Sequence, residues 1–356
     1  MKLLVLALTA ATLLAQSPRK QASPLDQLPQ HIEMLTFFGE RADFSPADTE
    51  VAFMAKSFGD AFVIHLKTRA IRCLTCNVPG AAFLRVMHLS TGDYLLIGPE
   101  RFTDIPTSRG RDNELWFLSK KPGSKPVRLG QKMSEGAAIS RKSMLISFSE
   151  TSGQNPDLPK GASNLIVAEV DLSGVTPALK NKRVVRSSPD DGCTLEAQDF
   201  YDDDRRMTYT CYEPKGHSSV WAMNLATSAT INQSKAIGSY NEVEGIFPDG
   251  LHTCVESDQQ AVRMGATKLF RDIDIWKLKL DGTGRSFERL TYFNEYEGWK
   301  ASNPVVSTDG RFMAFQAART ADEAGVGYGL LLLHFERDPP STQTGQAAAN
   351  TGFVLH

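Results

Sequence analysis

The stretch NPVVSTDGRFMAFQ, residues 303 to 316, reads as a short apolar strand, a tight polar turn and a second apolar strand. The same order recurs in DFSPADTEVAF at 43–53, MHLSTGDYLLI at 87–97 and IFPDGLHTCV at 246–255. Alternating apolar residues on both sides of a Gly- or Asp-containing turn predict antiparallel hairpins. A chain built from such repeats is restricted to a small number of all-β folds.

A complete repeat is visible in residues 272–316. DIDIWKLKL alternates like a half-buried strand, Asp281-Gly282 is a turn signal, FERLTYF is a second strand, and the 303–316 hairpin follows. Four antiparallel strands per repeat are typical of a propeller blade, and sheets that cannot bury both faces alone stack around an axis. Copies of the unit are indicated at 43–75, 85–129, 137–174, 198–228, 244–282 and 303–336.

The sixth copy lacks an outer strand, and HIEMLTFFG at 31–39 precedes the first copy. An N-terminal strand that completes the last blade would join the two ends of the ring and leave no open edge. The sequence therefore predicts an all-β fold, a six-bladed β-propeller closed by an N-terminal strand. A β-sandwich with a similar number of strands is the alternative, but sandwiches do not repeat so regularly.

The N-terminus reads as an export signal. MKLLVLALTAATLLAQ places one lysine before an apolar run that is too short to span a bilayer. We expect a signal peptide at 1–15, a leader at 16–30, the propeller at 31–337 and a disordered tail at 338–356. The protein is then exported, periplasmic or secreted, with no transmembrane segment in the mature chain. A net charge of -2 gives no basic surface for nucleic acid.

The five cysteines fall in a compartment that permits disulfides. Cys73 and Cys76 form a CxxC, for which we expect a local structural disulfide rather than redox catalysis, because neither a second CxxC nor a βαβ pattern accompanies it. Cys211 and Cys254 lie at matching strand positions, where buried structural thiols are expected. The odd number leaves at least one thiol free or paired between chains.

The blade signatures FSPADTEVAF, FPDGLHTCVE and STDGRFMAFQ lead into "D-I-W/Y" and "RLT" strands. They resemble the WD40-like (PD40) repeats of the TolB-like β-propeller family, over residues 31 to 337. The resemblance implies the propeller fold. Some propellers of this repeat class resemble metal-dependent oligosaccharide lyases, so the resemblance also keeps an enzymatic function open.

Aligning the copies on the residue before each hairpin turn brings polar residues to one place. Five residues before this aligned residue, at the start of each innermost strand, the alignment gives Glu40, Arg85, Glu135, Glu196, Glu242 and Ser302. Glu244 follows on one of the same strands. We expect these side chains to ring one mouth of the central channel. Carboxylates that are brought together raise one another's pKa or recruit a cation, so the predicted ligand-binding residues are Glu40, Arg85, Glu135, Glu196, Glu242 and Glu244.

The leading hypothesis is an exported propeller that binds an envelope protein or a small polar ligand at this acidic mouth without catalysis. A divalent cation such as calcium would suit the ring as a cofactor. The alternative is a metal-dependent lyase or hydrolase acting on saccharides, with an acid and a base among Glu135, Glu196 and Glu242. The chain contains no GxSxG or HExxH motif. An apolar rim around the mouth would favour a protein partner.

Overall fold

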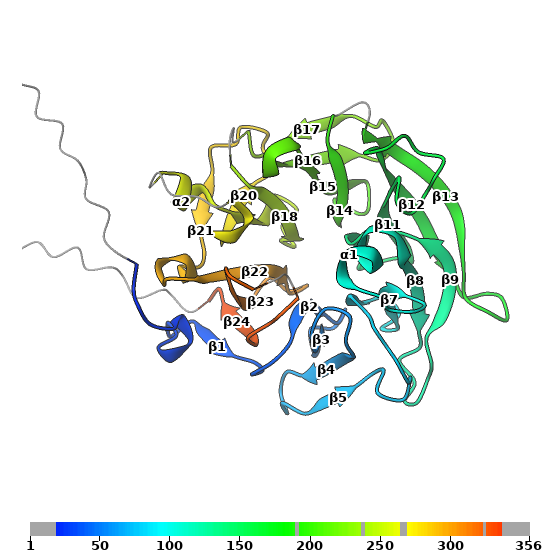
Figure 1. Ribbon diagram of the computed structural model, residues 1–356, viewed down its shortest axis with the longest axis horizontal. Helices are drawn as coiled ribbons and strands as arrows, with labels where there is room; N and C mark the ends of the chain where they lie inside the picture. The colour runs from blue at the N-terminus through cyan, green and yellow to red at the C-terminus, as the bar shows by residue number, and fades with distance from the viewer. Residues whose placement is uncertain (1–18, 189–191, 236–238, 264–268, 323–324, 337–356) are drawn as a thin grey trace, which may run out of the picture.

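The computed structural model describes residues 19–188, 192–235, 239–263, 269–322 and 325–336. Six four-stranded sheets surround a central axis (Figure 1), so the predicted six-bladed propeller is confirmed. The predicted signal peptide at 1–15 and the tail at 338–356 lie outside the described residues. In the described part of the chain, no helix combines the length and the apolar character that a membrane crossing requires.

The first three blades each contain four consecutive antiparallel strands, which follow one another from the axis outward. Blade one contains β2 (Glu40–Phe44), β3 (Glu50–Met54), β4 (Ala61–His65) and β5 (Ile71–Cys73). Blade two contains β6 (Arg85–His88), β7 (Tyr94–Pro99), β8 (Asn113–Leu118) and β9 (Val127–Lys132). Blade three contains β10 (Ala137–Ile139), β11 (Leu145–Thr151), β12 (Ser163–Asp171) and β13 (Ala178–Ser187).

Blades four and five follow the same order, and blade six differs only in its outer strand. Blade four contains β14 (Thr194–Tyr201), β15 (Arg206–Tyr212), β16 (Ser218–Asn224) and β17 (Thr230–Asn232). Blade five contains β18 (Asn241–Ile246), β19 (His252–Ser257), β20 (Asp274–Lys279) and β21 (Phe287–Arg289). Blade six contains β22 (Trp299–Val306), β23 (Phe312–Arg319), β24 (Leu330–His334) and the N-terminal β1 (Ile32–Met34).

The ring closes as the sequence predicts. β1 pairs antiparallel with β24, in the register Ile32 to Leu333 and Met34 to Leu331. Because the first strand of the propeller completes the last blade, β1 and β24 lie side by side at one place in the ring (Figure 1). This pairing satisfies the edge of β24 and ties blade six to the start of blade one.

The hydrophobic core is divided into layers between neighbouring blades. One such layer joins Leu95 and Ile97 of blade two to Ile146 and Phe148 of blade three, and all four side chains are fully buried. Each blade therefore buries its faces against two neighbours, which is why a single four-stranded unit would not be stable alone.

The cysteines are partly as predicted. Cys73 and Cys76 form the expected local disulfide, and Cys254 is a free, buried thiol. The prediction was wrong for Cys211, which forms a disulfide with Cys193. The connection from blade three places Cys193 just ahead of β14, and Cys211 lies opposite Leu195 in the β14–β15 ladder. This proximity depends on the hairpin register and has no signature in the spacing of the two cysteines.

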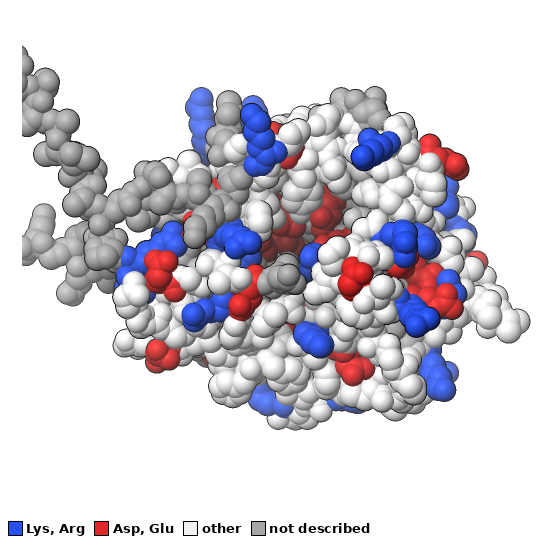
Figure 2. Space-filling model, in the orientation of Figure 1, with Lys and Arg blue, Asp and Glu red and all other residues white. Residues whose placement is uncertain are grey.

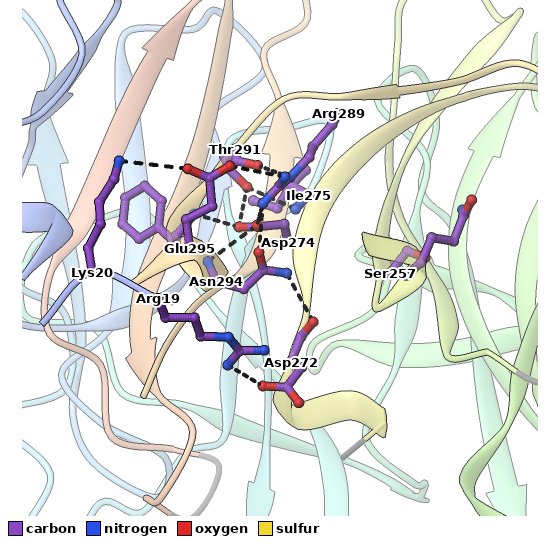
Figure 3. A network of polar contacts seen from close by, with 12 residues as sticks. Arg19, Lys20, Ser257, Asp272, Asp274, Ile275, Arg289, Thr291, Asn294 and Glu295 are labelled. Carbon is purple, nitrogen blue, oxygen red and sulfur yellow. Dashed lines mark hydrogen bonds and ion pairs between the residues drawn. The ribbon is translucent and has the colours of Figure 1, made fainter. Parts of the chain in front are cut away.

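The described part of the leader, from residue 19, packs along blades five and six. Lys20 forms a parallel bridge with Tyr296, and Ser23 caps a short 3-10 helix, η1 (Pro24–Asp26). Figure 3 shows Arg19 and Lys20 pointing toward carboxylates of blade five and the connection to blade six. Arg19 pairs with Asp272 at 2.8 Å, and Lys20 lies 3.7 Å from Glu295.

Removing residues 19–30 is expected to lower the free energy of unfolding by about 2–4 kcal/mol without opening the ring. Pro24 is buried, and Leu25 and Leu28 pack against the core of blade six; their burial contributes about 1 kcal/mol or more each. The exposed pair of Lys20 adds little. Denaturant unfolding of chains that begin at residues 19 and 31 measures the difference. Equal stabilities would contradict a packed leader.

Candidate functional site

Each blade starts with its innermost strand and continues outward through antiparallel strands. All six innermost strands therefore run in the same direction and begin at the same face of the ring. A cavity of about 270 Å³ opens at this face. We call it the mouth cavity. Figure 2 shows a hollow at the centre of the ring in which acidic side chains gather. Its ionisable lining residues are Arg41, Arg85, Arg109, Glu135, Glu196, Tyr212, Tyr240, Glu242, Glu256, Lys300, Arg319 and Asp322.

The predicted ring is assembled in part. Arg85, Glu135, Glu196 and Glu242 line the mouth cavity, together with Ser302. Glu40 does not line it: the side chain is fully buried, and its carboxylate accepts a hydrogen bond of 2.6 Å from the Ser57 hydroxyl. Glu244 also lies elsewhere, in a second cavity further along the channel.

Arg41 occupies the place in blade one that the alignment assigned to Glu40. The register of the β2–β3 ladder shifts between Glu40 and Asp43, and Arg41 has a left-handed backbone with φ of 56°. Such a bulge bends the strand and redirects the side chains that follow it. The β22–β23 ladder shifts in the same place, where Asn303 has φ of 49° and lines the cavity.

One half of the mouth cavity is basic and centres on Glu135. Its carboxylate lies 2.5 Å from Arg41 Nη2 and accepts a hydrogen bond of 2.8 Å from Arg109 Nε. Burial would raise the pKa of Glu135, but the charges of Arg41, Arg109 and Arg85 outweigh it and hold the pKa well below its usual range. Glu135 therefore stays ionised. Arg85 Nε is buried without a hydrogen-bond partner among the described residues.

The other half is acidic and phenolic. Glu242 and Glu256 lie directly opposite each other in the β18–β19 ladder, and both are more than nine-tenths buried. Glu242 accepts hydrogen bonds from the hydroxyls of Tyr212, at 2.5 Å, and Tyr240. Like charges directly opposite each other destabilise a sheet. This half of the cavity therefore favours a cation.

Glu196 completes the acidic half. Burial, together with the charges of Glu242 and Glu135, raises its pKa to about 8. Burial and Glu242 raise the pKa of Glu256 to about 8 as well. Gly136 makes room for the Glu196 side chain: a Cβ there would overlap the Glu196 side chain and lie 2.7 Å from the Ala197 carbonyl oxygen.

The expectation of an acidic mouth therefore needs a correction. The lining residues include five cations and five carboxylates, and three of each sign are separated by position. Lys300 is the exception in the acidic half, where its charge interacts with Glu242 and Glu256. Arg41, Arg85 and Arg109 come from blades one and two, whereas Glu196, Glu242 and Glu256 come from blades four and five. Such a polarised cavity fits a ligand with a cationic group and an acceptor group better than it fits a bare cation.

Among the residues that the structure describes, no preformed metal site is found in the mouth cavity. Across the described residues, the metal-ligating atoms of three His, Cys, Asp or Glu side chains lie within 4.8 Å of one another only at Asp60, Cys73 and Cys76. The ring carboxylates do not meet that distance. A divalent cation such as calcium stays a prediction that this arrangement does not favour, since calcium takes six to eight oxygen ligands at about 2.3–2.6 Å.

The second cavity lies further along the channel, has a volume of about 90 Å³ and shares Arg41, Arg85 and Asn303 with the first. Glu244 lines it, and burial together with Glu242 raises its pKa well above the usual value. Asp199 lines it too; burial raises its pKa to about 6 although backbone amides of Phe200 and Ile246 donate to its carboxylate. Because they share three lining residues, the two cavities adjoin each other.

Sequence analysis missed several residues of the mouth cavity. Arg109 comes from the loop between β7 and β8, which contains the short helices α1 (Ile105–Thr107) and η2 (Ser108–Asp112). Tyr212 and Tyr240 lie at a strand end and in a blade connection. Of these residues, only Glu256 could have been found from the sequence. Pairing the two strands of its hairpin outward from the turn places Glu256 opposite Glu242.

Stability is expected to fall as pH rises from about 5 to 9. The folded-state pKa of Glu196 is raised from 4.5 to about 8. The stability that the folded protein gains by keeping this carboxyl protonated is therefore complete below pH 4.5 and is lost as pH rises through 8. Glu196→Gln should therefore be more stable than the parent at pH 9, by at least about 1.4 kcal/mol, the free energy of one pKa unit.

Denaturant unfolding at pH 5, 7 and 9 measures this effect. Glu135→Gln is the matched control with the opposite sign, because the Glu135 carboxylate is stabilised by Arg41 and Arg109 and its loss should destabilise the protein at pH 9. Parallel pH profiles for Glu196→Gln and the parent would show that the carboxyl is not strained in the folded state.

Solved structures confirm the fold. A putative TolB from Agrobacterium tumefaciens matches with a TM-score of 0.53 and 16% identity, over 74% of this chain and 79% of that chain. A calcium-binding regucalcin from the same species matches with a TM-score of 0.52 and 11% identity, over 84% of this chain and 92% of that chain. The tricorn protease matches with a TM-score of 0.51 and 13% identity, over 85% of this chain and 26% of the protease chain. No protein-family model and no curated protein matches the chain. The similarity thus shows a TolB-like propeller fold and nothing finer.

Proposed function

We propose that the chain is an exported propeller whose mouth cavity binds a protein partner, with a basic side chain of the partner in the acidic half of the cavity. The observation that carries the proposal is the pair Glu242 and Glu256, two buried carboxylates fixed opposite each other in one ladder. With Glu196 beside them, a lysine or arginine of the partner would take the place of the protons that the raised pKa values of Glu196 and Glu256, about 8, keep on these carboxyls in the free protein.

Apolar residues around the opening support a protein partner over a small polar ligand. The loops that lead into the innermost strands, and those between second and third strands, share the mouth face. Their exposed large side chains include Phe37, Phe38, Phe102, Phe270, Tyr292 and Val326. Phe37 is 87% exposed, and Phe270 and Val326 line the cavity itself. Aromatic anchors around a polar centre are typical of protein interfaces.

Selection from a displayed library of short random peptides on the mature protein tests this proposal. Selected peptides are expected to contain a lysine or arginine between apolar residues. Their dissociation constants, measured by fluorescence anisotropy, should rise at least about tenfold with Glu256→Gln, which is a loss of about 1.4 kcal/mol. The exposed Glu288 of β21 supplies the control variant, Glu288→Gln, which should bind as the parent does.

Two outcomes would contradict the proposal. Selected peptides without a basic residue, or with affinities insensitive to Glu256→Gln, would remove the role of the carboxylates. Free amines or amino acids that raise the melting temperature as much as the peptides would instead favour a small polar ligand. Gly136→Ala probes the same site without changing a charge, because its methyl group displaces Glu196; it should weaken peptide binding in the same direction.

A saccharide-cleaving enzyme is the second candidate, and one observation favours it. Glu135 is held ionised by two arginines, while the pKa of Glu196 is raised to about 8 by burial and its acidic neighbours. Two nearby carboxyls with separated pKa values are the arrangement that glycosidases use as base and acid. Gly136 packs against Glu196 and is the next residue after Glu135, so the two carboxyls are neighbours where the basic and acidic halves of the cavity meet.

An activity screen decides this second candidate. Polyuronates and neutral glycans, with and without divalent cations, are incubated with the mature protein, and reducing ends and unsaturated products are measured. An enzyme of this kind would lose its activity in Glu196→Gln. Turnover that is absent from the parent, or equal in parent and variant, would remove the carboxyl pair from consideration as acid and base.

A further inference from the structure

The CxxC lies at the outer edge of blade one, away from the channel. Cys73 ends β5 and is half-buried, while Cys76 is exposed in the connection that leads toward blade two. Asp60 precedes β4 and faces the same place. The hydroxyl of Thr75 ties the two segments together, since it donates to Asp60 Oδ1 at 2.6 Å and accepts from the Ala61 amide at 3.0 Å.

These three side chains form a ligand set that crosses two strands. One ligand atom from each of Asp60, Cys73 and Cys76 lies within 4.8 Å of the others. The Cα atoms of the cysteines are 5.8 Å apart. Zinc takes thiolate sulfur at about 2.3 Å and carboxylate oxygen at about 2.0–2.2 Å. Rotation about the cysteine side-chain bonds would separate two free sulfurs enough to share one ion.

A second observation points to a thiolate at this place. The backbone N–H of Cys76 donates to Cys73 Sγ at 3.0 Å. In this structure the accepting sulfur belongs to the disulfide. A hydrogen bond to the charged form of a group stabilises that form, so the same backbone amide would favour the Cys73 thiolate once the disulfide is reduced. Two thiolates and one carboxylate without a cation would repel one another. The oxidised pair removes that repulsion by forming a neutral disulfide, and a divalent ion would remove it in the reduced protein.

We propose that Asp60, Cys73 and Cys76 form a redox-gated site for a thiophilic divalent ion of the zinc class, closed by the disulfide and opened by its reduction. Thiol exchange with a dithiol transfers two electrons, so the Cys73–Cys76 bond breaks, two thiols form and the dithiol becomes a disulfide. Binding of the ion then releases two thiol protons. The three protein ligands leave a fourth tetrahedral position for water.

The disulfides of the described chain differ in how a reductant can reach them. Cys76 is exposed, whereas Cys193 and Cys211 are 7% and 3% exposed and Cys254 is fully buried. Access limits exchange. Mild treatment with a water-soluble phosphine, which becomes the phosphine oxide as one water supplies the oxygen, should therefore open Cys73–Cys76 first. Alkylation and peptide mass spectrometry should find label on these two cysteines before any on Cys193 or Cys211.

The test uses cobalt(II) as a spectroscopic substitute for zinc on the mature, mildly reduced protein. One equivalent of cobalt should produce a thiolate-to-metal charge-transfer band, and zinc should displace it. The oxidised protein and the double variant Cys73→Ser, Cys76→Ser should show no band. Circular dichroism and a melting curve of the double variant establish that it folds. Asp60→Asn should raise the dissociation constant for zinc at least tenfold.

The outcomes separate clearly. A reduced parent that shows no charge-transfer band, or a band that persists in the double serine variant, overturns the metal site. Equal zinc affinity in Asp60→Asn and the parent overturns the three-ligand set. The site is distant from the mouth cavity, so peptide binding there should be unchanged in the double serine variant, and a failure of either proposal is distinguishable from a failure of the other.

Discussion

Replacing Arg41 with methionine is expected to lower the free energy of unfolding by about 3–5 kcal/mol, the range for breaking a buried ion pair from one side. Arg41 is 6% exposed and contacts two carboxylates, at 3.5 Å from Glu40 and 2.5 Å from Glu135. Glu135 would keep Arg109. The fully buried Glu40 would keep only the Ser57 hydroxyl, and one neutral donor does not compensate a buried charge.

A double-mutant cycle separates this mechanism from a simple loss of packing. Glu40→Gln in the Arg41→Met background should recover at least about 1 kcal/mol, because it removes the uncompensated charge. Arg111→Met is the matched control: Arg111 is exposed and pairs with its neighbour Asp112, so its loss should stay within about 0.5 kcal/mol. Additive effects of the two substitutions would show that Arg41 and Glu40 do not interact.

Asp274→Ala is expected to destabilise the protein by a similar amount, about 3–5 kcal/mol. The carboxylate is fully buried and lies at the centre of the network in Figure 3. It accepts hydrogen bonds from Arg289 Nη2 at 2.7 Å, the Thr291 hydroxyl at 2.9 Å and the Phe293 amide at 2.9 Å. Alanine would remove the acceptor of the Thr291 hydroxyl and the Phe293 amide, in the segment that joins blade five to blade six. Arg289 Nη2 would keep Asn294 Oδ1 as an acceptor but lose its buried charge partner.

Denaturant unfolding at pH 7.5 measures the effect. Burial raises the pKa of Asp274 to about 6 although Arg289 acts against the shift, so the carboxyl is mostly ionised at that pH. Glu288→Ala is the control: Glu288 is exposed on the outer strand β21, which also carries Arg289, and its loss should change the free energy of unfolding by no more than about 0.5 kcal/mol. A small loss for Asp274→Ala would mean that water replaces the carboxylate and that the network does not hold the two blades together.

The fold could be predicted because its determinants are local and repeated. Each hairpin carries its own alternation and turn residues, and a strand alternates with a fixed period of two, so a wrong register would expose a whole apolar face. The closing strand was predictable for the same reason: a blade that lacks one strand and a spare strand at the other end of the chain leave one solution. β1 pairs with β24 as expected.

The candidate site was predictable only as far as the regular strand register holds. Glu135, Glu196 and Glu242 reach the mouth cavity from the positions that the repeat assigns to them. In blade one, an irregular bulge with a left-handed arginine turns Glu40 away and Arg41 inward. The turn residues on which the alignment depended lie at the other end of the strand and carry no information about that bulge.

The sequence by itself determined the propeller, the number of blades and the end of the channel at which charged residues gather. Tertiary structure decided which charges meet there. Arg109 arrives from a loop of blade two, Tyr212 and Tyr240 from blades four and five, and the Cys193–Cys211 pair from a strand register. Local alternation specifies strands because neighbours in sequence are neighbours in the strand, whereas the balance of charge in a cavity depends on side chains that only the closed ring brings together.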